Sequence, residues 1–394
     1  MAEQYAILVL NQVSQVGLKR LPAETYSVSK DAPRPDAILV RSADLHATPI
    51  ADSVKAIGRA GAGTNNIPVT AMSKRGVPVF NAPGANANAV KELVLAGMLM
   101  AARNLVPAVQ FVGGLRGDDE AVAKRIEDEK KRFAGVELPG HTLGVIGLGK
   151  IGSLVADAAI RLGMHVLGYD PDITVDAAWS LPSTVKKAHS IDEVLKGSHF
   201  VTLHVPLTAK TRGLIGAKDL AHLRPGAILL NFSREGIVRE DAVLEALASH
   251  RLKAYVTDFP SAALAAQPGV IALPHLGAST RESEDNSAVM VVDQVRDYLE
   301  HGNIRNAVNF PDVVMQRESP YRVAIANANV PNMLGQISTA MARAGLNIHN
   351  MMNKSKGEMA YTLVDVDSRV PPEVIETIRR IDGVLAIRYL PLQG

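Results

Sequence analysis

The stretch HTLGVIGLGKIGSLVADAAIRLGMHVLGYD, from His141 to Asp170, decides the fold of this chain. It holds two apolar runs typical of buried parallel strands, with a glycine-rich turn and a helical pattern between them. The turn reads GLGKIG over residues 147–152, and the second apolar run ends at the acidic Asp170. Strand, glycine turn, helix, strand and acid within about thirty residues make up the complete pattern for binding a dinucleotide.

Each feature of this stretch has a physical role in holding such a ligand. Gly147 allows the tight turn, Gly149 lets the backbone approach a pyrophosphate, and Gly152 lets the helix pack closely on the strand. The helix N-terminus then offers free N–H groups and a positive dipole end to the phosphates. Asp170 can accept hydrogen bonds from the ribose hydroxyls and repels a 2′-phosphate, so the predicted cofactor is NAD rather than NADP. The simpler alternative is a glycine-rich turn in an ordinary α/β domain, and it leaves the position of the acid unexplained.

Composition narrows the class of protein. Of the 394 residues, 47% are hydrophobic and 21% are charged, which is typical of a globular chain. A net charge of +2 provides no strong field for nucleic acid, and the lack of cysteine excludes disulfides and thiolate metal ligands. The most apolar stretch, residues 93–102, is too short to cross a bilayer. We therefore expect a cytoplasmic protein with no nucleic-acid or membrane partner and no metal.

Alternating strand and helix patterns predict an α/β fold with three domains. Residues 1–97, completed by residues 286–312, are expected to form a doubly wound parallel sheet of the flavodoxin-like kind. Residues 98–285 contain the glycine turn and predict a second doubly wound sheet, a Rossmann domain. Residues 318–394 show a βαββαβ pattern, the ferredoxin-like order. The Asn- and Pro-rich segment 306–320 before it is predicted to be a linker.

Polar residues follow three predicted strands of the Rossmann domain, at the carboxyl edge where this fold binds ligands. Hydride transfer between a hydroxyl carbon and nicotinamide needs a general base, most often histidine. It also needs a fixed cation for the substrate carboxylate, a task that suits arginine. His275 and Arg234 meet these two needs. His204 also follows a strand, but because Val205 and Pro206 come next, packing is the better interpretation for it.

Two further arginines, Arg41 and Arg59, follow predicted strands of the first domain. A guanidinium matches carboxylate and phosphate groups in a bidentate way, so both arginines are candidates to hold an anionic substrate. From the residues alone, two ordinary surface arginines explain the pattern equally well.

Taken together, these motifs resemble the D-isomer-specific 2-hydroxyacid dehydrogenases, over almost the whole chain and in the order of that family. The similarity rests on the glycine turn with its acid and on further segments, which are residues 204–207, 231–234, 274–277, 40–42, 58–61, 81–83 and 92–94. The C-terminal pattern looks like an ACT domain, in the short arrangement with no further domain between it and the Rossmann domain.

The resemblance implies a role for each candidate residue. Arg234 would bind the substrate carboxylate and carbonyl, His275 would exchange a proton with the 2-hydroxyl, and Arg41 with Arg59 would hold a C3 phosphate. The other implied substrate contacts are Ser42, Ala60, Gly61 and Asn86. The implied cofactor contacts are Gly147, Gly149, Lys150, Ile151, Gly152, Asp170, His204, Val205, Pro206, Phe232, Ser233, Asp258 and Gly277. The implied contacts of an L-serine effector, held across a dimer interface, are Asn327, Asn329 and Asn347.

One departure from the family pattern concerns the histidine. The family places a glutamate shortly before it, in a segment of the type Asp-x-Phe-x-x-Glu, where it orients and charge-stabilises the imidazole. Aligned on Phe259-Pro260, that position is Ala262 in this chain. Without a carboxylate partner the pKa of the histidine should fall. Asp258 is the nearest acid in the sequence and a candidate substitute.

The resemblance therefore implies NAD-dependent oxidation of D-3-phosphoglycerate to 3-phosphohydroxypyruvate, the first step of the phosphorylated route to L-serine. A homodimer or homotetramer is the expected assembly. Two rivals remain open at this point. One is the same chemistry on another small 2-hydroxy acid. The other is a weakly active NAD-sensing binding protein, an idea motivated by Ala262.

Overall fold

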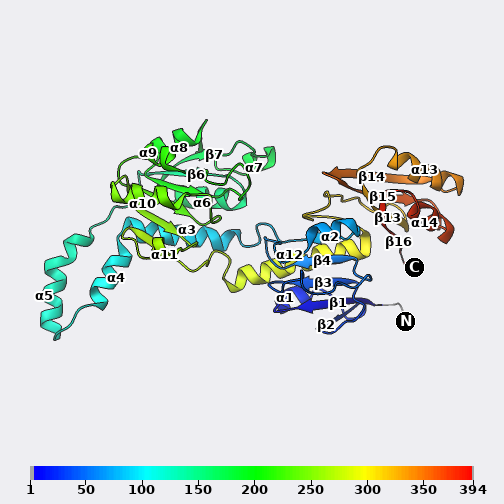
Figure 1. Ribbon diagram of the computed structural model, residues 1–394, viewed down its shortest axis with the longest axis horizontal. Helices are drawn as coiled ribbons and strands as arrows, with labels where there is room; N and C mark the ends of the chain where they lie inside the picture. The colour runs from blue at the N-terminus through cyan, green and yellow to red at the C-terminus, as the bar shows by residue number, and fades with distance from the viewer. Residues whose placement is uncertain (1–3, 393–394) are drawn as a thin grey trace. The chain divides into compact units, whose positions relative to one another are not determined.

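A computed structural model describes residues 4–392 of the chain, which folds as two compact units (Figure 1). The first unit takes in residues 1–86 and 281–394, and the second takes in residues 87–280. The contact boundary lies before the helix α3 (Ala87–Ala102), whereas the sequence places a domain boundary after residue 97. The difference has a packing reason. A Cβ on Gly97 would lie 2.9 Å from Val256 and 3.0 Å from Phe232, so α3 is pressed against the sheet of the second unit.

A seven-stranded parallel sheet in the order β12-β11-β10-β9-β6-β7-β8 forms the core of the second unit. The strands are β6 (Thr142–Ile146), β7 (His165–Tyr169), β8 (Lys186–Lys187), β9 (Phe200–Leu203), β10 (Ala227–Asn231), β11 (Leu252–Thr257) and β12 (Val270–Ala272). The chain order reverses between β6 and β9. Ligands of doubly wound sheets bind at the carboxyl ends of the strands at such a reversal, so the glycine turn after β6 lies where a dinucleotide is expected.

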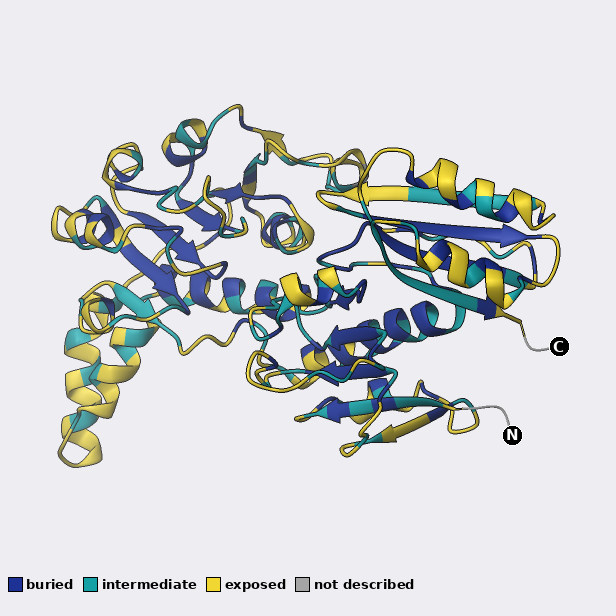
Figure 2. Cartoon of the chain, turned by 45° about the vertical axis from the view of Figure 1, so that its right-hand side comes forward, coloured by how far each residue is buried: buried dark blue, intermediate teal, exposed yellow. Residues whose placement is uncertain are grey.

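Helices cover both faces of this sheet. They are α6 (Lys150–Arg161), α7 (Val175–Trp179), α8 (Ile191–Gly197), α9 (Ala217–Ala221), α10 (Glu240–Ala248) and α11 (Ala262–Ala265), in addition to α3. An arm projects from the same unit and consists of α4 (Leu105–Gly113), α5 (Asp119–Glu129) and the 3₁₀ turn η1 (Lys130–Phe133) (Figures 1 and 2). None of the residues in the arm is buried.

Among the described residues, no single helix is both long and apolar enough for a membrane span. The helices α3 and α4 meet that criterion of length and composition only when taken together, and they are bent by 68° at the break between them.

The first unit begins with a five-stranded parallel sheet in the order β2-β1-β3-β4-β5. Its strands are β1 (Tyr5–Leu10), β2 (Tyr26–Ser29), β3 (Ala37–Val40), β4 (Ala56–Arg59) and β5 (Val79–Phe80), and its helices are α1 (Gln15–Leu18), α2 (Val69–Lys74) and the long α12 (Arg281–His301). Close packing fixes α12 on this sheet, because a Cβ on Gly58 would lie 2.8 Å from Val291 and Val295. The strand order is the flavodoxin-like one.

An antiparallel sheet in the order β14-β15-β13-β16 completes the first unit. Its elements are β13 (Tyr321–Ala328), α13 (Met333–Arg343), β14 (Ile348–Lys356), β15 (Met359–Val366), α14 (Pro372–Arg379) and β16 (Val384–Pro391). This is the predicted βαββαβ order, so the predicted fold class is confirmed for all three sheets. The helices α13 and α14 pack on one face through Val323, Ile337 and Ile378. The other face shares a core with the first sheet, where the Tyr361 ring lies 6.4 Å from that of Tyr298.

The predicted linker, residues 306–320, is largely a packed segment. Phe310 and Val313 are fully buried, and Val313 forms a β-bridge with Ile304. The Asn309 side chain accepts from the backbone N–H of Val79 at 2.9 Å. Asparagine and proline indicate irregular backbone, which is correct here, but they do not indicate whether that backbone is exposed.

Candidate active site

The glycine turn is held by backbone contacts among the carboxyl ends of three strands. The Gly147 N–H donates to the Tyr169 carbonyl at 2.9 Å, and the His204 N–H donates to the Ile146 carbonyl at 2.7 Å. Gly147 has φ +93°, and a Cβ there would lie 2.7 Å from the His204 backbone. Only glycine satisfies both conditions. The turn is thus built by β6, β7 and β9 together.

The other two glycines of the turn have different surroundings. A Cβ on Gly152 would lie 1.9 Å from the Gly147 carbonyl oxygen, so the first turn of α6 packs against the glycine turn with no room for a side chain. Around Gly149 nothing lies within 4 Å of such a Cβ, and both Gly149 and Lys150 are exposed. Open space in front of a helix N-terminus is what a pyrophosphate requires. The residues present therefore fit a dinucleotide.

Asp170 is oriented by the turn itself. Its Oδ2 accepts from the Leu148 N–H at 2.8 Å and its Oδ1 accepts from the Asp172 N–H at 3.0 Å. Each carboxylate oxygen keeps a second lone pair for a ribose hydroxyl. The acid predicted from spacing thus lies beside the glycines, at the end of β7.

His204 follows the neighbouring strand β9. Its Nε2 lies 3.0 Å from the Thr202 hydroxyl, and burial of the ring lowers its pKa to about 3. A histidine that stays neutral over the working pH range is a poor general acid–base group. Its close backbone contact with Gly147 supports the packing interpretation. Val205 and Pro206, the next predicted cofactor contacts, continue from it toward the surface.

Asp258 immediately follows β11, whereas Arg234 and His275 lie in the loops that follow the two strands beside it, β10 and β12. The register pairs Asn231 of β10 with Thr257 of β11, and Thr257 with Ala272 of β12. Asp258 therefore follows the middle strand, with the arginine after one neighbour and the histidine after the other. The structure thus brings the two predicted catalytic residues to the same edge of the second unit.

Asn231 organises the loop that carries Arg234. Its Oδ1 accepts from the Ser233 N–H and hydroxyl at 3.2 and 3.0 Å, and its Nδ2 donates to the Arg234 carbonyl at 3.1 Å. Phe232 and Ser233 are buried. Arg234 is an exposed residue, and its Nη1 donates to the Ser233 carbonyl at 2.7 Å. Sequence reasoning missed Asn231 as a site residue. Its place at the end of a buried strand was the available signal.

His275 is exposed and has φ +49°, in the left-handed region. Its N–H donates to the Asp258 and Leu273 carbonyls, both at 3.0 Å, and its ring lies 4.9 Å from the Phe259 ring. Gly277 donates its N–H to Asp258 Oδ2 at 3.1 Å. Backbone contacts with residue 258 therefore fix the place of the histidine.

The predicted substrate arginines lie at neighbouring strand ends of the first unit. Val40, the last residue of β3, pairs in register with Arg59 of β4, so Arg41 and Arg59 are close in space. The Arg59 guanidinium lies over Gly61, because a Cβ there would be 2.3 Å from Nη1. Ala82 donates its N–H to the Gly61 carbonyl at 3.0 Å, which joins this loop to the end of β5.

The remaining predicted substrate residues belong to the same loops. Ser42 is exposed beside Arg41, Ala60 is buried, and Asn86 ends the first of the two segments that make up the first unit. A residue that sequence reasoning missed is Glu284 of α12, whose Oε2 lies 2.7 Å from Arg41 Nη1. No local pattern connects two residues so far apart in the sequence.

The three predicted effector asparagines do not lie together within one chain. Asn329 donates from Nδ2 to the Gly357 carbonyl at 3.1 Å, whereas Asn347 donates its N–H to Asp367 at 3.1 Å. These contacts lie at opposite ends of β15, at least about 24 Å apart at 3.4 Å per residue. Asn327 is buried with Nδ2 bonded to the Ala328 carbonyl at 2.8 Å. Any single site that uses all three must draw them from two copies of the chain.

Within residues 4–392, no group of three or more His, Asp or Glu side chains is arranged to hold a metal ion.

Comparison with known proteins agrees with this geometry. The family model for the D-isomer specific 2-hydroxyacid dehydrogenase NAD-binding domain matches residues 95–277. A D-3-phosphoglycerate dehydrogenase of Methanocaldococcus jannaschii is 35% identical, over 92% of this chain and 68% of the relative. This chain belongs to the D-isomer-specific 2-hydroxyacid dehydrogenase family. The dehydrogenase is thus an oxidoreductase that uses NAD, and the predicted family and cofactor are confirmed.

Further relatives bear the same name. A D-3-phosphoglycerate dehydrogenase of Synechocystis is 37% identical over 81% of the dehydrogenase, which spans 57% of that relative's length. The crystal structure of NAD+-bound 3-phosphoglycerate dehydrogenase from Entamoeba histolytica is similar with a TM-score of 0.60 and 26% identity, over 78% of this chain and 99% of that one.

Proposed function

We propose that the dehydrogenase oxidises D-3-phosphoglycerate to 3-phosphohydroxypyruvate, with reduction of NAD to NADH and release of one proton, as the first step of the phosphorylated route to L-serine. The observation that carries the proposal is the placement of Arg234 and His275 after β10 and β12, on the same sheet edge as the glycine turn. The names of the relatives supply the substrate. We propose the cytoplasm as its compartment.

Each residue then has a distinct task. The guanidinium of Arg234, an exposed residue, binds the substrate carboxylate and polarises the developing carbonyl. His275 takes the proton from the 2-hydroxyl as the C2 hydrogen leaves as hydride. Bound NAD supplies the hydride acceptor. On the first unit, Arg41 and Arg59 hold the C3 phosphate by charge-assisted hydrogen bonds.

The test is the reverse reaction, followed as loss of NADH absorbance with 3-phosphohydroxypyruvate. Wild type should turn over, and His275→Ala should lose at least about 100-fold in kcat, within the range for a general acid. NADH binding is measured separately by energy transfer from the single tryptophan, Trp179, which lies in the second unit and is 85% exposed. Saturable NADH binding without turnover in the wild type would refute the proposal and favour an NAD-sensing protein.

The two arginines distinguish a phosphorylated substrate from another 2-hydroxy acid. Replacement of both Arg41 and Arg59 by alanine should raise KM for the phosphorylated keto acid at least tenfold, because two charge-assisted contacts are lost. KM for an unphosphorylated keto acid such as hydroxypyruvate should change little. Equal effects on both substrates would remove the phosphate assignment and support the broader activity.

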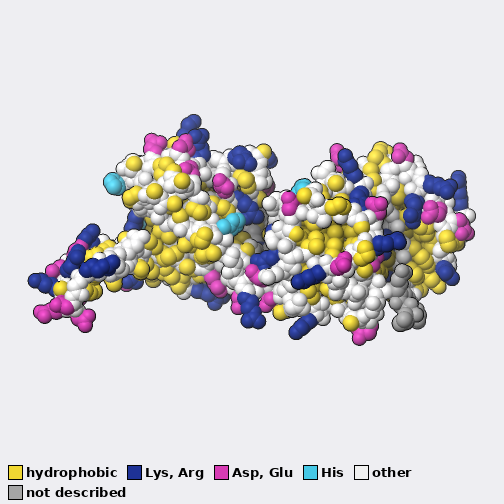
Figure 3. Space-filling model, turned by 60° about the horizontal axis from the view of Figure 1, so that its bottom comes forward, with side chains coloured by type: hydrophobic (Ala, Val, Ile, Leu, Met, Phe, Trp, Pro, Cys, Tyr) yellow, Lys and Arg dark blue, Asp and Glu magenta, His cyan; other side chains and the backbone are white. Residues whose placement is uncertain are grey.

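We also propose that the dehydrogenase works as a homo-oligomer. The arm exposes Leu105, Val109 and Val112, with Val109 71% exposed, while charged side chains gather at its tip (Figure 3). Apolar side chains on a projecting helix favour a protein partner. Val109→Asp should therefore lower the mass measured by light scattering.

A site for L-serine that uses both Asn329 and Asn347 should require the ACT-like domains of two copies of the chain.

A further inference from the structure

The position of the family glutamate is occupied by an alanine that cannot take its place. Ala262 is the first residue of α11 and is exposed, and Ser261 caps that helix by accepting from the Leu264 N–H at 3.1 Å. A methyl group neither accepts a hydrogen bond nor carries charge. If His275 acts as the proposed acid–base group, a carboxylate for it must come from elsewhere.

Asp258 is the acid that the sheet itself places there. It follows the strand between those of Arg234 and His275, and neighbouring strands are about 4.8 Å apart. Its backbone carbonyl accepts the His275 N–H at 3.0 Å, so residues 258 and 275 are paired directly.

The side chain of Asp258 is buried, with 1% of the residue exposed, and its two oxygens differ. Oδ2 accepts from the Gly277 N–H at 3.1 Å, two residues beyond the histidine. Oδ1 has no hydrogen-bond partner among the described residues. A buried carboxylate oxygen without a donor is costly in a folded chain and calls for a partner, such as a ligand, a water or a catalytic group.

The charged groups near the Asp258 carboxyl also connect it with His275 and Arg234. Burial raises the pKa of Asp258, while the Gly277 N–H and then the positive charges of His275 and Arg234 lower it. Another ionisable group that interacts with it is the buried Tyr255, whose pKa is raised mainly by burial and to a lesser degree by Glu240 and Asp258. The cations that act on Asp258 are thus the two proposed catalytic residues.

We propose that Asp258 is the positioning residue that orients His275 and stabilises its protonated form, in place of the family glutamate. The proposal rests on the proposed function of His275. Asp258 acts through the histidine and transfers no proton to substrate. The rival carboxylate is Glu235, which follows Arg234, is exposed, and lines a hollow of about 560 Å³ with Phe259 and Ser261.

The experiment compares Asp258→Asn with Glu235→Gln. Asparagine keeps an oxygen acceptor for the Gly277 N–H, so the fold should survive, and circular dichroism checks this. Turnover of 3-phosphohydroxypyruvate is measured from pH 5.5 to 9.5. In this direction His275 must be protonated, so activity falls as pH rises through its pKa. Asp258→Asn should lower kcat at least about 100-fold, as loss of an orienting acid does in triads. It should also move the basic limb of the pH profile about one pH unit lower.

A second measurement does not depend on turnover. The pKa of His275 can be followed by NMR of the chain labelled at histidine Cε1, with His275→Gln to assign the signal. It should fall in Asp258→Asn and stay in place in Glu235→Gln. A shift of the His275 pKa in Glu235→Gln alone would overturn the proposal. So would lower turnover in Asp258→Asn without a change in either the basic limb of the pH profile or the NMR pKa of His275, since that result indicates a purely structural role for Asp258. If the wild type fails to turn over, the proposed function fails, while the NMR titration still decides the pairing.

Discussion

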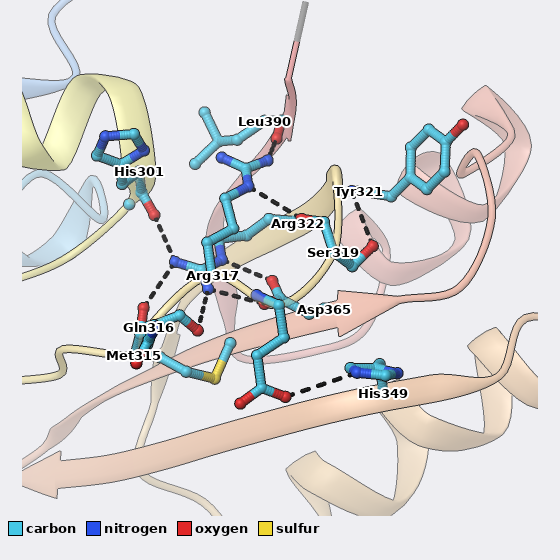
Figure 4. A network of polar contacts seen from close by, with 12 residues as sticks. His301, Met315, Gln316, Arg317, Ser319, Tyr321, Arg322, His349, Asp365 and Leu390 are labelled. Atoms are coloured by element: carbon cyan, nitrogen blue, oxygen red, sulfur yellow. Dashed lines mark hydrogen bonds and ion pairs between the residues drawn. The ribbon is translucent and has the colours of Figure 1, made fainter. Parts of the chain in front are cut away.

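The buried ion pair between Arg322 and Asp365 allows a sharp prediction about stability. The two residues face each other on β13 and β15, and both side chains are fully buried. Arg322 Nε and Nη2 donate to the two carboxylate oxygens at 2.6 and 2.8 Å. The remaining N–H groups donate to the carbonyls of His301, Met315 and Gln316 at 3.0–3.1 Å (Figure 4). All five donors of the guanidinium are therefore satisfied.

This network ties the end of α12 and the predicted linker to the C-terminal sheet. Asp365→Asn would leave a buried guanidinium without its counter-charge, and such a loss costs about 3–5 kcal/mol of unfolding free energy. Arg322→Met should cost at least as much, because three backbone carbonyls also lose their donor at about 1–3 kcal/mol each. In the double variant Arg322→Met/Asp365→Asn, the buried carboxylate without a counter-charge is gone and the carbonyl losses remain. It should therefore be more stable than Arg322→Met alone.

The assay is urea unfolding followed by far-ultraviolet circular dichroism and analysed as a double-mutant cycle. Trp179 fluorescence reports the second unit separately, since that residue lies outside the first unit. The matched control is Arg379→Met, which breaks the exposed pair with Glu376 and should change stability by less than about 0.5 kcal/mol. A loss below about 1 kcal/mol in Asp365→Asn, or strictly additive single losses, would show that the network does not hold the sheet to the rest of the unit.

Three further predictions concern the second unit. Gly152→Ala forces a Cβ against the Gly147 carbonyl and should lower the melting temperature. Gly149→Ala places its methyl group in open space, so this variant should melt like wild type but bind NADH at least tenfold more weakly, because the methyl group occupies the pyrophosphate position. Unchanged NADH binding would contradict that placement. Asp170→Ser should raise kcat/KM with NADPH relative to NADH by at least tenfold, and an unchanged ratio would remove the acid from cofactor choice. Burial lowers the pKa of His204 from 6.5 to about 3. Below pH 6.5 the unfolded chain therefore binds a proton that the folded chain does not, and the free energy of unfolding should decrease as the pH is lowered from 6.5 to about 3. His204→Gln should flatten that dependence in urea unfolding, and an identical slope in both proteins would refute the assignment.

Local pattern was sufficient for the cofactor site. The glycines and Asp170 lie within one strand–turn–helix–strand unit, so their spacing in the sequence is their spacing in space. Arg234 and His275 were predicted for a related reason. Each ends a buried strand, and the ends of parallel strands collect at one edge of a sheet.

Tertiary structure alone decided the rest. The position of Asp258 between the two catalytic candidates follows from strand order, which no local pattern encodes. The same holds for the pairing of Arg41 with Glu284 and for the separation of Asn329 from Asn347. Asn and Pro in the segment 306–320 predict a linker because they indicate irregular backbone, whereas the burial of that segment depends on what packs against it. The His141–Asp170 stretch thus determines the cofactor site through local geometry, while the position of Asp258 beside His275 depends on which strands become neighbours.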